Sequence, residues 1–428
     1  MRIGALALCL LAAPVAADQA LPRDAEDTHV GVVICSNSTC HGASSPSAFA
    51  SVQQNEFLVW KQKDPHARAY ASLGTERAQQ IAARLGIDKA QGAAACLVCH
   101  SDYVPAARRG KNHSNADGVA CEACHGGAQR WLGVHSAGIT GHEGNLKLGM
   151  FPTENPKARA RLCLSCHQGT ASAPMSHRLL GAGHPRLALE LDSYTLARPA
   201  HHIEDADYRQ RKPGQHPLKT WSLGQLESAA EWRALFADTR ANPGGTWPEF
   251  SFYQCFGCHR AWGTGGSGTG MPRLDTSRLE MVGLVLDQVA PERAAAWDSA
   301  LQALQRTDDH AALVRAMNAL DPLLDAARGA AAGRKFAVAD ARALFAALAA
   351  RAARGEFTAH ATAEQATYAA AICVDVLAQA EPALRADEVQ KAVEALYAAS
   401  DDGSRHDSAK WHEALNRLDG LVRAAPSG

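Results

Sequence analysis

The chain has 428 residues, with 43 Lys and Arg against 44 Asp and Glu and a formal net charge of −1 at pH 7. This balance, with no basic stripe and no polybasic cluster, gives no indication that the chain binds nucleic acid or a lipid surface. A chain of this length normally contains more than one domain.

The first 17 residues have the pattern of a secretory signal peptide. Arg2 precedes an apolar stretch, and this stretch ends in small residues at Ala16 and Ala17, just before Asp18. We expect cleavage after Ala17. No later apolar run approaches the length of a membrane span, so we expect a soluble protein in the periplasm.

Five times in the chain, a pair of cysteines is followed at once by a histidine. Four of these runs read C-x-x-C-H, and the first has four residues between its cysteines. The five sets are Cys35, Cys40 and His41; Cys96, Cys99 and His100; Cys121, Cys124 and His125; Cys163, Cys166 and His167; and Cys255, Cys258 and His259. C-x-x-C-H is the attachment signature of a c-type haem. The thiols bond to the haem vinyl groups and the histidine binds the iron, so we expect five covalently attached haem c groups.

Two other uses of paired cysteines explain this pattern less well. Zinc knuckles use C-x-x-C runs, but zinc does not require a histidine directly after each second cysteine. Disulfides are common in exported chains, but they leave the five histidines without an explanation. Haem attachment accounts for the cysteines and the histidines together.

Regular structure is expected to be sparse in the haem-binding half, residues 18–262. The segment around Trp60 is expected to be helical as far as Asp64, which can cap a new helix with Pro65 at its first position. Apolar residues then recur at helical spacing up to Gly86, a typical C-terminal stop. The remainder is expected to be loop and short helix, because five haem groups would supply much of the apolar core.

The composition changes after the fifth motif. Residues 263–274 form a glycine-rich linker, and residues 275–428 are rich in alanine with helical periodicity. Ser277-x-x-Glu280 predicts a capping box at the start of the first helix. Further helices are expected at about 292–306, 309–327, 338–353, 362–379, 386–399 and 407–423. The predicted fold is therefore mainly α, a multihaem cytochrome domain followed by an all-α bundle without haem.

Each haem iron has a second axial position on the side away from its motif histidine. The haem-binding half contains ten further histidines for these five positions: His29, His66, His113, His135, His142, His177, His184, His201, His202 and His216. Histidine on both sides gives a closed iron suited to electron transfer, whereas an open position permits catalysis.

Three sequence segments resemble multihaem c-type cytochromes related to the tetrahaem electron acceptor of hydroxylamine oxidoreductase. They are Trp60-Lys-Gln-Lys-Asp-Pro-His66-Ala-Arg-Ala-Tyr70, the run from Asp117 through the third motif to Trp131-Leu-Gly-Val-His135, and Gly181-Ala-Gly-His184-Pro-Arg-Leu. The resemblance covers roughly residues 29–262 and implies that His66, His135 and His184 are distal iron ligands. The chain departs from the family by its fifth motif and its helical C-terminal half.

Two more distal ligands are needed. We expect His177, which follows the fourth motif closely, and His29, which precedes the first motif and can reach another haem. His113 is the reserve. The other four histidines of this half, His142, His201, His202 and His216, are expected to be loop residues.

Two functions are compatible with this sequence. The first is a periplasmic electron carrier that exchanges electrons with redox protein partners, for which the haem supplies the chemistry. The second is a multihaem oxidoreductase with one open iron that acts on a small nitrogen or sulfur compound. For such an enzyme, the segment between the fourth and fifth motifs is the best place to find catalytic groups. No lysine replaces a motif histidine, and we favour the carrier.

Overall fold

The computed structural model describes residues 19–47, 52–212, 216–238, 247–259, 273–306 and 309–425. The proposed signal peptide lies outside the described residues, and so does most of the expected linker. The described part is mainly helical, as predicted, with one two-stranded sheet. None of its helices has the length and apolar character that crossing a membrane would require.

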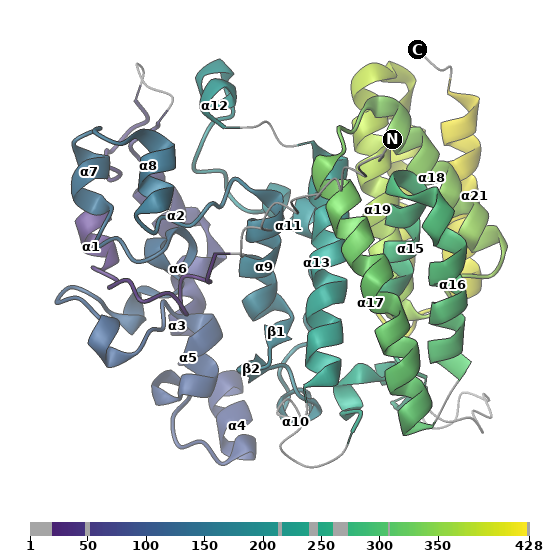
Figure 1. Cartoon of the computed structure of the whole chain (residues 1–428), viewed down its shortest axis with the longest axis horizontal. Helices are drawn as coiled ribbons and strands as arrows, with labels where there is room; N and C mark the ends of the chain where they lie inside the picture. The colour runs from purple at the N-terminus through teal and green to yellow at the C-terminus, as the bar shows by residue number, and fades with distance from the viewer. Residues whose placement is uncertain are drawn as a thin grey trace, which may run out of the picture.

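The first half of the chain forms short helices joined by loops (Figure 1). They are α1 (Val32–Cys35), α2 (Glu56–Lys63), α3 (Ala69–Ser72), α4 (Glu76–Leu85), α5 (Ala94–His100), α6 (Cys121–His125), α7 (Leu132–Ser136), α8 (Gly141–Lys147), α9 (Pro156–His167), α10 (His177–Gly181), α11 (Leu191–Ala197), α12 (Ala206–Arg211) and α14 (Cys255–Cys258). Single turns of 3-10 helix lie at η1 (Pro65–Arg68), η2 (Ala90–Gly92), η3 (Ala106–Arg108), η4 (Asn115–Asp117) and η6 (Phe250–Phe252). The sheet consists of antiparallel β1 (Gly169–Thr170) and β2 (Ala173–Pro174), in which Gly169 is opposite Pro174.

Local sequence signals explain several of these helix boundaries. The Asp64 side chain accepts a hydrogen bond from the backbone N–H of His66, and Pro65 is the first residue of η1. Thr75 caps α4, and Gly86 ends that helix with φ of 74°. A left-handed conformation of this kind favours glycine, because other residues have a Cβ that clashes there.

Long helices pack as a bundle in the second half. They are α13 (Pro217–Ala237), α15 (Ser277–Val289), α16 (Pro291–Arg306), α17 (His310–Gly333), α18 (Val338–Ala353), α19 (His360–Ala380), α20 (Asp387–Ser400) and α21 (Ser408–Ala424), with a 3-10 turn η7 (Pro382–Arg385). The six expected helices after residue 290 correspond to α16–α21. The expected capping box of Ser277 and Glu280 is not formed: Ser277 is already helical, and Thr276 is the cap residue. The Thr276 hydroxyl donates to the Glu280 side chain instead of accepting from the backbone of the first turn.

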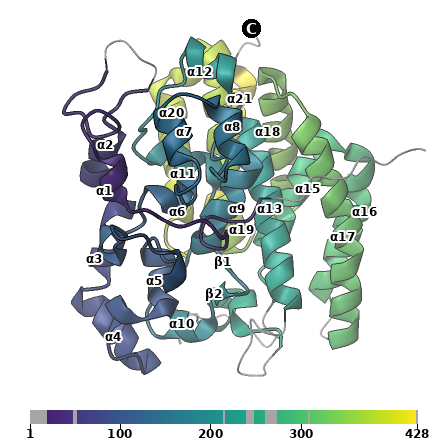
Figure 2. The same ribbon diagram turned by 60° about the vertical axis from the view of Figure 1, so that its left-hand side comes forward.

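One large apolar core fills the bundle and extends beyond the expected domain boundary at residue 275. The core includes residues of α13, such as Trp221 and Leu226, together with Phe252 and Leu274. The helix α13 packs between α9 on one side and α15 and α17 on the other (Figures 1 and 2). The described residues before α13, by contrast, contain only small clusters of buried apolar residues.

Polar contacts join the two halves along α13. Ser228 on α13 donates to the side chain of Gln168 over 2.7 Å, and the Gln168 amide donates to the Ser228 carbonyl over 3.0 Å. Gly224 lies so close to α11 that a Cβ atom there would be 2.7 Å from the Cβ of Leu191. The helix carrying the fourth motif is therefore fixed against the bundle.

Candidate haem sites

The motif cysteines lie on short helices or at their ends. The third motif forms the whole of α6, the second and fourth motifs end α5 and α9, and the fifth cysteine pair spans α14. The first motif differs, because α1 ends at Cys35 and the longer spacing to Cys40 runs through a turn. We refer to these as the first to fifth sites, in chain order. None of the described cysteines forms a disulfide, so the thiols are available for covalent attachment.

A second histidine lies opposite each of the five motif histidines. The ring centres are separated by 6.1 Å for His41 and His135, 6.4 Å for His100 and His184, 6.2 Å for His125 and His201, 6.0 Å for His167 and His66, and 6.1 Å for His259 and His177. These distances lie at the long end of the range for paired rings, and they are similar in all five pairs.

The spacing of the pairs fits a metal ion between two imidazoles. An imidazole nitrogen binds a metal ion at about 2.0–2.1 Å and lies about 1 Å from its ring centre, so two axial imidazoles place their ring centres about 6 Å apart. All five pairs meet this requirement, and each adds a histidine to two cysteines. The donor set therefore fits a covalently held haem iron with two histidine ligands.

Hydrogen bonds orient several of these rings through the nitrogen that would not face the iron. Nδ1 of His41 lies 3.0 Å from Glu56, and Nδ1 of His66 lies 2.8 Å from Asp64. Nδ1 of His100 and of His184 face the carbonyls of Ala69 and Pro185, at 3.0 and 2.9 Å. Metal-binding histidines commonly donate their second N–H to such acceptors, which leaves Nε2 free for the metal.

Burial keeps the most enclosed imidazoles neutral, as metal ligation requires. Burial, together with the charges of His201, Lys212 and Arg198, lowers the pKa of His125 to about 3. Burial and the charge of His66 lower the pKa of His167 to about 4. The pKa of His201 is lowered to about 4 by burial and by Arg198.

Four of the five expected distal histidines lie opposite a motif histidine: His66, His135, His177 and His184. The structure places the fifth, His29, in a different setting. Nδ1 of His29 lies 2.8 Å from Asp102, its Nε2 lies 3.3 Å from the Pro22 carbonyl, and its nearest ring neighbour is His113. Nε2 of His113 lies 2.7 Å from the Asp102 carbonyl, so both histidines are engaged by protein groups.

His201 takes the position expected for His29. Sequence reasoning missed it, because no spacing rule connects residue 201 with a motif that ends at residue 125. The other three histidines assigned to loops have protein partners: His142 pairs with Glu154 at 2.7 Å, His202 stacks on Tyr208, and His216 caps α13.

Cysteines of different motifs meet in the first half. The thiols of Cys35 and Cys121 lie close enough to interact, and this interaction raises the pKa of Cys121. Cys99 and Cys166 interact in the same way. Burial raises the pKa of Cys124 to about 12, and the nearby Cys163 adds to this effect. The first site therefore adjoins the third, the third adjoins the fourth, and the fourth adjoins the second.

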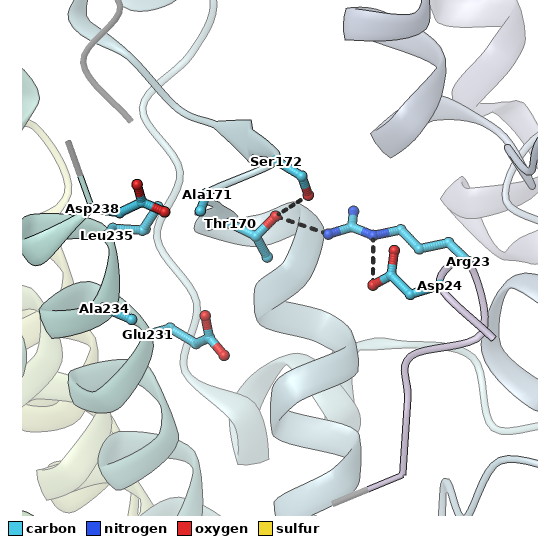
Figure 3. A pocket seen from close by; sticks show the side chains of 9 residues that line it. All are labelled: Arg23, Asp24, Thr170, Ala171, Ser172, Glu231, Ala234, Leu235 and Asp238. Carbon is cyan, nitrogen blue, oxygen red and sulfur yellow. Dashed lines mark hydrogen bonds and ion pairs between the residues drawn. The ribbon is translucent and has the colours of Figure 1, made fainter. Parts of the chain in front are cut away.

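A separate cavity of about 510 Å³ opens between the β1–β2 hairpin and α13 (Figure 3). Arg23 reaches across it to donate to Thr170 over 2.9 Å, and carboxylates of Asp24, Glu231 and Asp238 line its sides. None of the histidine pairs lies in this cavity.

Residues 34–126 match the family model described as cytochrome c554 and c-prime. The match covers part of the haem-binding half, including the first three motifs. It supports a c-type cytochrome with covalently bound haem. Comparison with curated proteins and with solved structures found no match.

Proposed function

We propose that the chain is an exported cytochrome with five haem c groups that carries electrons between redox protein partners in the periplasm. The observation that carries this proposal is the set of five histidine pairs, each formed by one motif histidine and one histidine from elsewhere. When bound, haem supplies reversible one-electron chemistry at its iron. We also propose that the relationship to the electron acceptor of hydroxylamine oxidoreductase extends over the haem-binding half.

The residues of each site have separate roles in this proposal. The ten motif cysteines hold the cofactors covalently. The five motif histidines bind the irons from one side, and His135, His184, His201, His66 and His177 bind from the other side at the first to fifth sites. Two histidines for each iron favour electron transfer over substrate binding.

The arrangement of the sites supports a continuous path for electrons. The interactions between cysteines of different motifs support the order first, third, fourth and second. His177 of the fifth site begins α10, and His184 of the second site follows the end of that short helix. The fifth site therefore continues the series beyond the second, although it lies last in the sequence. Electrons would enter and leave near the first and fifth sites.

The mass of the mature holoprotein under denaturing conditions tests this proposal. We expect the chain without residues 1–17 plus five haem groups, and five electrons taken up in a reductive titration. Replacing Cys121 and Cys124 together with alanine should remove one haem. Replacing Cys373, a buried cysteine outside the motifs, with serine should leave five. Release of haem on denaturation would contradict the proposal.

A further inference from the structure

Phe256 lies between the two cysteines of the fifth motif, and it is the only aromatic residue at such a position in the five motifs. Its ring packs against the bundle. It contacts His360, the first residue of α19, with 5.7 Å between the ring centres and 89° between the ring planes. Nε2 of His360 lies 2.9 Å from the carbonyl of Ser400 at the end of α20, so the ring that Phe256 contacts is itself fixed by the bundle.

Gly403, in the loop between α20 and α21, contacts the same ring. A Cβ atom at Gly403 would lie 2.1 Å from Cε2 of Phe256 and 2.7 Å from Nδ1 of His360. Non-bonded atoms cannot come so close, so only glycine fits here while Phe256 keeps its position. The φ angle of Gly403 is not positive. The close approach of Phe256, and not the backbone conformation, therefore requires glycine at this position.

The chain before the fifth motif is bound to a second part of the bundle. The backbone N–H of Gln254 donates to the Arg273 carbonyl over 2.9 Å, and the N–H of Asp275 donates to the Phe252 carbonyl over 2.7 Å. Residues 273–275 lead directly into α15. The fifth motif is therefore held both by the start of α15 and by the contact of Phe256 with Gly403 and His360.

The helix α19 also holds the segment that carries the distal histidine of the second site. Arg186, two residues after His184, donates to both carboxylate oxygens of Glu364 over 2.7 Å. Glu364 lies one helical turn after His360 on α19. One helix of the bundle therefore contacts groups of both the second and the fifth sites, which are neighbours in the proposed series.

We propose that the bundle positions the haem of the fifth site, and that Gly403 and His360 do so through Phe256. This inference rests on the proposed haem at the fifth motif. Phe256 follows Cys255 directly in the motif, so a displacement of its ring moves the attachment point of the haem. The orientation of the axial ligands and the burial of the haem both affect its reduction potential. Gly403 is therefore a positioning residue for one end of the electron path.

Gly403→Ala in the full-length holoprotein tests the proposal, with spectroelectrochemical titration and electron paramagnetic resonance spectra as the readouts. The added methyl group displaces Phe256, which exposes the fifth haem to water and favours the more highly charged oxidised iron. We expect one of five potentials to fall and the spectrum of the same single haem to change. Gly329→Ala adds a methyl group on α17, where no atom lies within 4 Å, and should leave all five potentials unchanged.

Phe256→Ala provides the second background for this test. Without the ring, the methyl group of Gly403→Ala has room, so the double variant should have the same five potentials as Phe256→Ala alone. If Gly403→Ala alone loses the fifth haem, the double variant should regain it.

Two results would overturn the proposal and leave the electron-carrier function intact. The first is a Gly403→Ala chain with five haems and five unchanged potentials. The second is an equal effect of Gly403→Ala, on potential or haem content, with and without the Phe256 ring. Fewer than five haems in the parent chain would instead contradict the proposed function.

Discussion

In the proposed set of ligands, the second ring nitrogen separates a ligand such as His184 from a structural residue such as His29. His184 presents one nitrogen to His100 across 6.4 Å between ring centres and the other to a carbonyl. In His29, both nitrogens are engaged by Asp102 and Pro22. A histidine count cannot separate these cases, because the difference lies in contacts between residues far apart in the chain.

Replacing His184 with methionine tests its role as a ligand. Methionine in place of an axial histidine raises the reduction potential of a haem. We expect one potential to rise by on the order of 0.1 V, a fraction of the range of about 0.8 V that axial ligands span. Spectroelectrochemical titration measures the change. His142→Met is the control, since His142 pairs with Glu154, and five unchanged potentials in His184→Met would remove His184 from the ligand set.

Arg351 is the principal buried cation of the bundle. Its side chain is 6% exposed and bonds Asp287, Asp298 and Glu356. Although burial opposes the charge, Asp287 and Asp298 raise the pKa of Arg351. Arg351→Met would leave these carboxylates without their counter-charge and should lower the free energy of unfolding by about 3–5 kcal/mol. Chemical denaturation followed by circular dichroism measures this loss.

Arg354 provides the matched control for Arg351. It bonds Glu356, but its side chain is 57% exposed. Arg354→Met should therefore cost less than about 1 kcal/mol. Equal losses of unfolding free energy in the two variants would show that burial of the Arg351 ion pairs contributes nothing to stability.

Glu280, in the first turn of α15, gives the bundle a dependence on pH. Burial is the main cause that raises its pKa to about 7, and the nearby Asp275 adds to it against the hydrogen bond from Thr276. The folded state therefore favours the protonated carboxyl. This stabilisation is complete below pH 4.5 and is lost as the pH rises to about 7, by at most about 3 kcal/mol.

Comparison with Glu280→Gln isolates this effect. The amide stays neutral, so the variant should be more stable than the parent chain at pH 8 and similar at pH 4.5. Thermal unfolding at both values measures the difference. A constant difference between the two chains across this range would exclude titration of Glu280.

At the scale of single elements, the sequence predicts the helices of the bundle, but it does not predict that α13 packs against them. Apolar residues repeat at helical spacing in each of α16–α21. This periodicity predicts a helix without any knowledge of the elements that it packs against. The sequence of α13 precedes the fifth motif, so composition assigns it to the haem-binding half. Its burial against α15 and α17 depends on how the chain folds back. A fragment 275–428 would expose this face of the core.

The close approach of α13 and α11 predicts the effect of a single methyl group. Gly224→Ala would place a Cβ 2.7 Å from that of Leu191, and the resulting overpacking costs typically 1–3 kcal/mol. This exceeds the gain of about 1 kcal/mol that alanine brings to a helix. We expect the Tm to fall.

Gly420 on α21 is the control position for this substitution. No atom lies within 4 Å of a Cβ built there, so Gly420→Ala should raise the Tm through helix propensity alone. If Gly224→Ala raised the Tm equally, the two helices would have to be further apart than described.

At the scale of the whole molecule, the two halves differ in the apolar core that stabilises each of them. The bundle, together with α13, has one extended apolar core, whereas the described residues before α13 have small clusters around Leu97 and Leu164. Without covalent haem, the first half has too little buried apolar surface to offset the loss of chain entropy. The sequence motifs already indicated that haem would supply much of the apolar core of this half. The part of the division that only the three-dimensional structure shows is the inclusion of α13 in the core of the bundle.

Removing the haem should therefore unfold the first half and leave the bundle folded. We expect a chain produced without haem attachment to retain the helical signal of α15–α21 while residues 19–212 lose protection from hydrogen exchange. Hydrogen–deuterium exchange with mass spectrometry, compared with the holoprotein, measures both halves at once. Equal protection in the two forms would show that the first half folds without haem.

The hydrogen bonds that hold the end of α9 against the bundle bear on how fast the fourth site could exchange electrons. The fourth motif occupies the last turns of α9, and the next residue, Gln168, is bonded to Ser228 of α13 and to Arg278 of α15. We expect a site held in this way to change little in shape when its charge changes, which would keep its reorganisation energy small. In the proposed series the fourth site stands between the third and the second, and a low barrier there would let electrons pass in either direction.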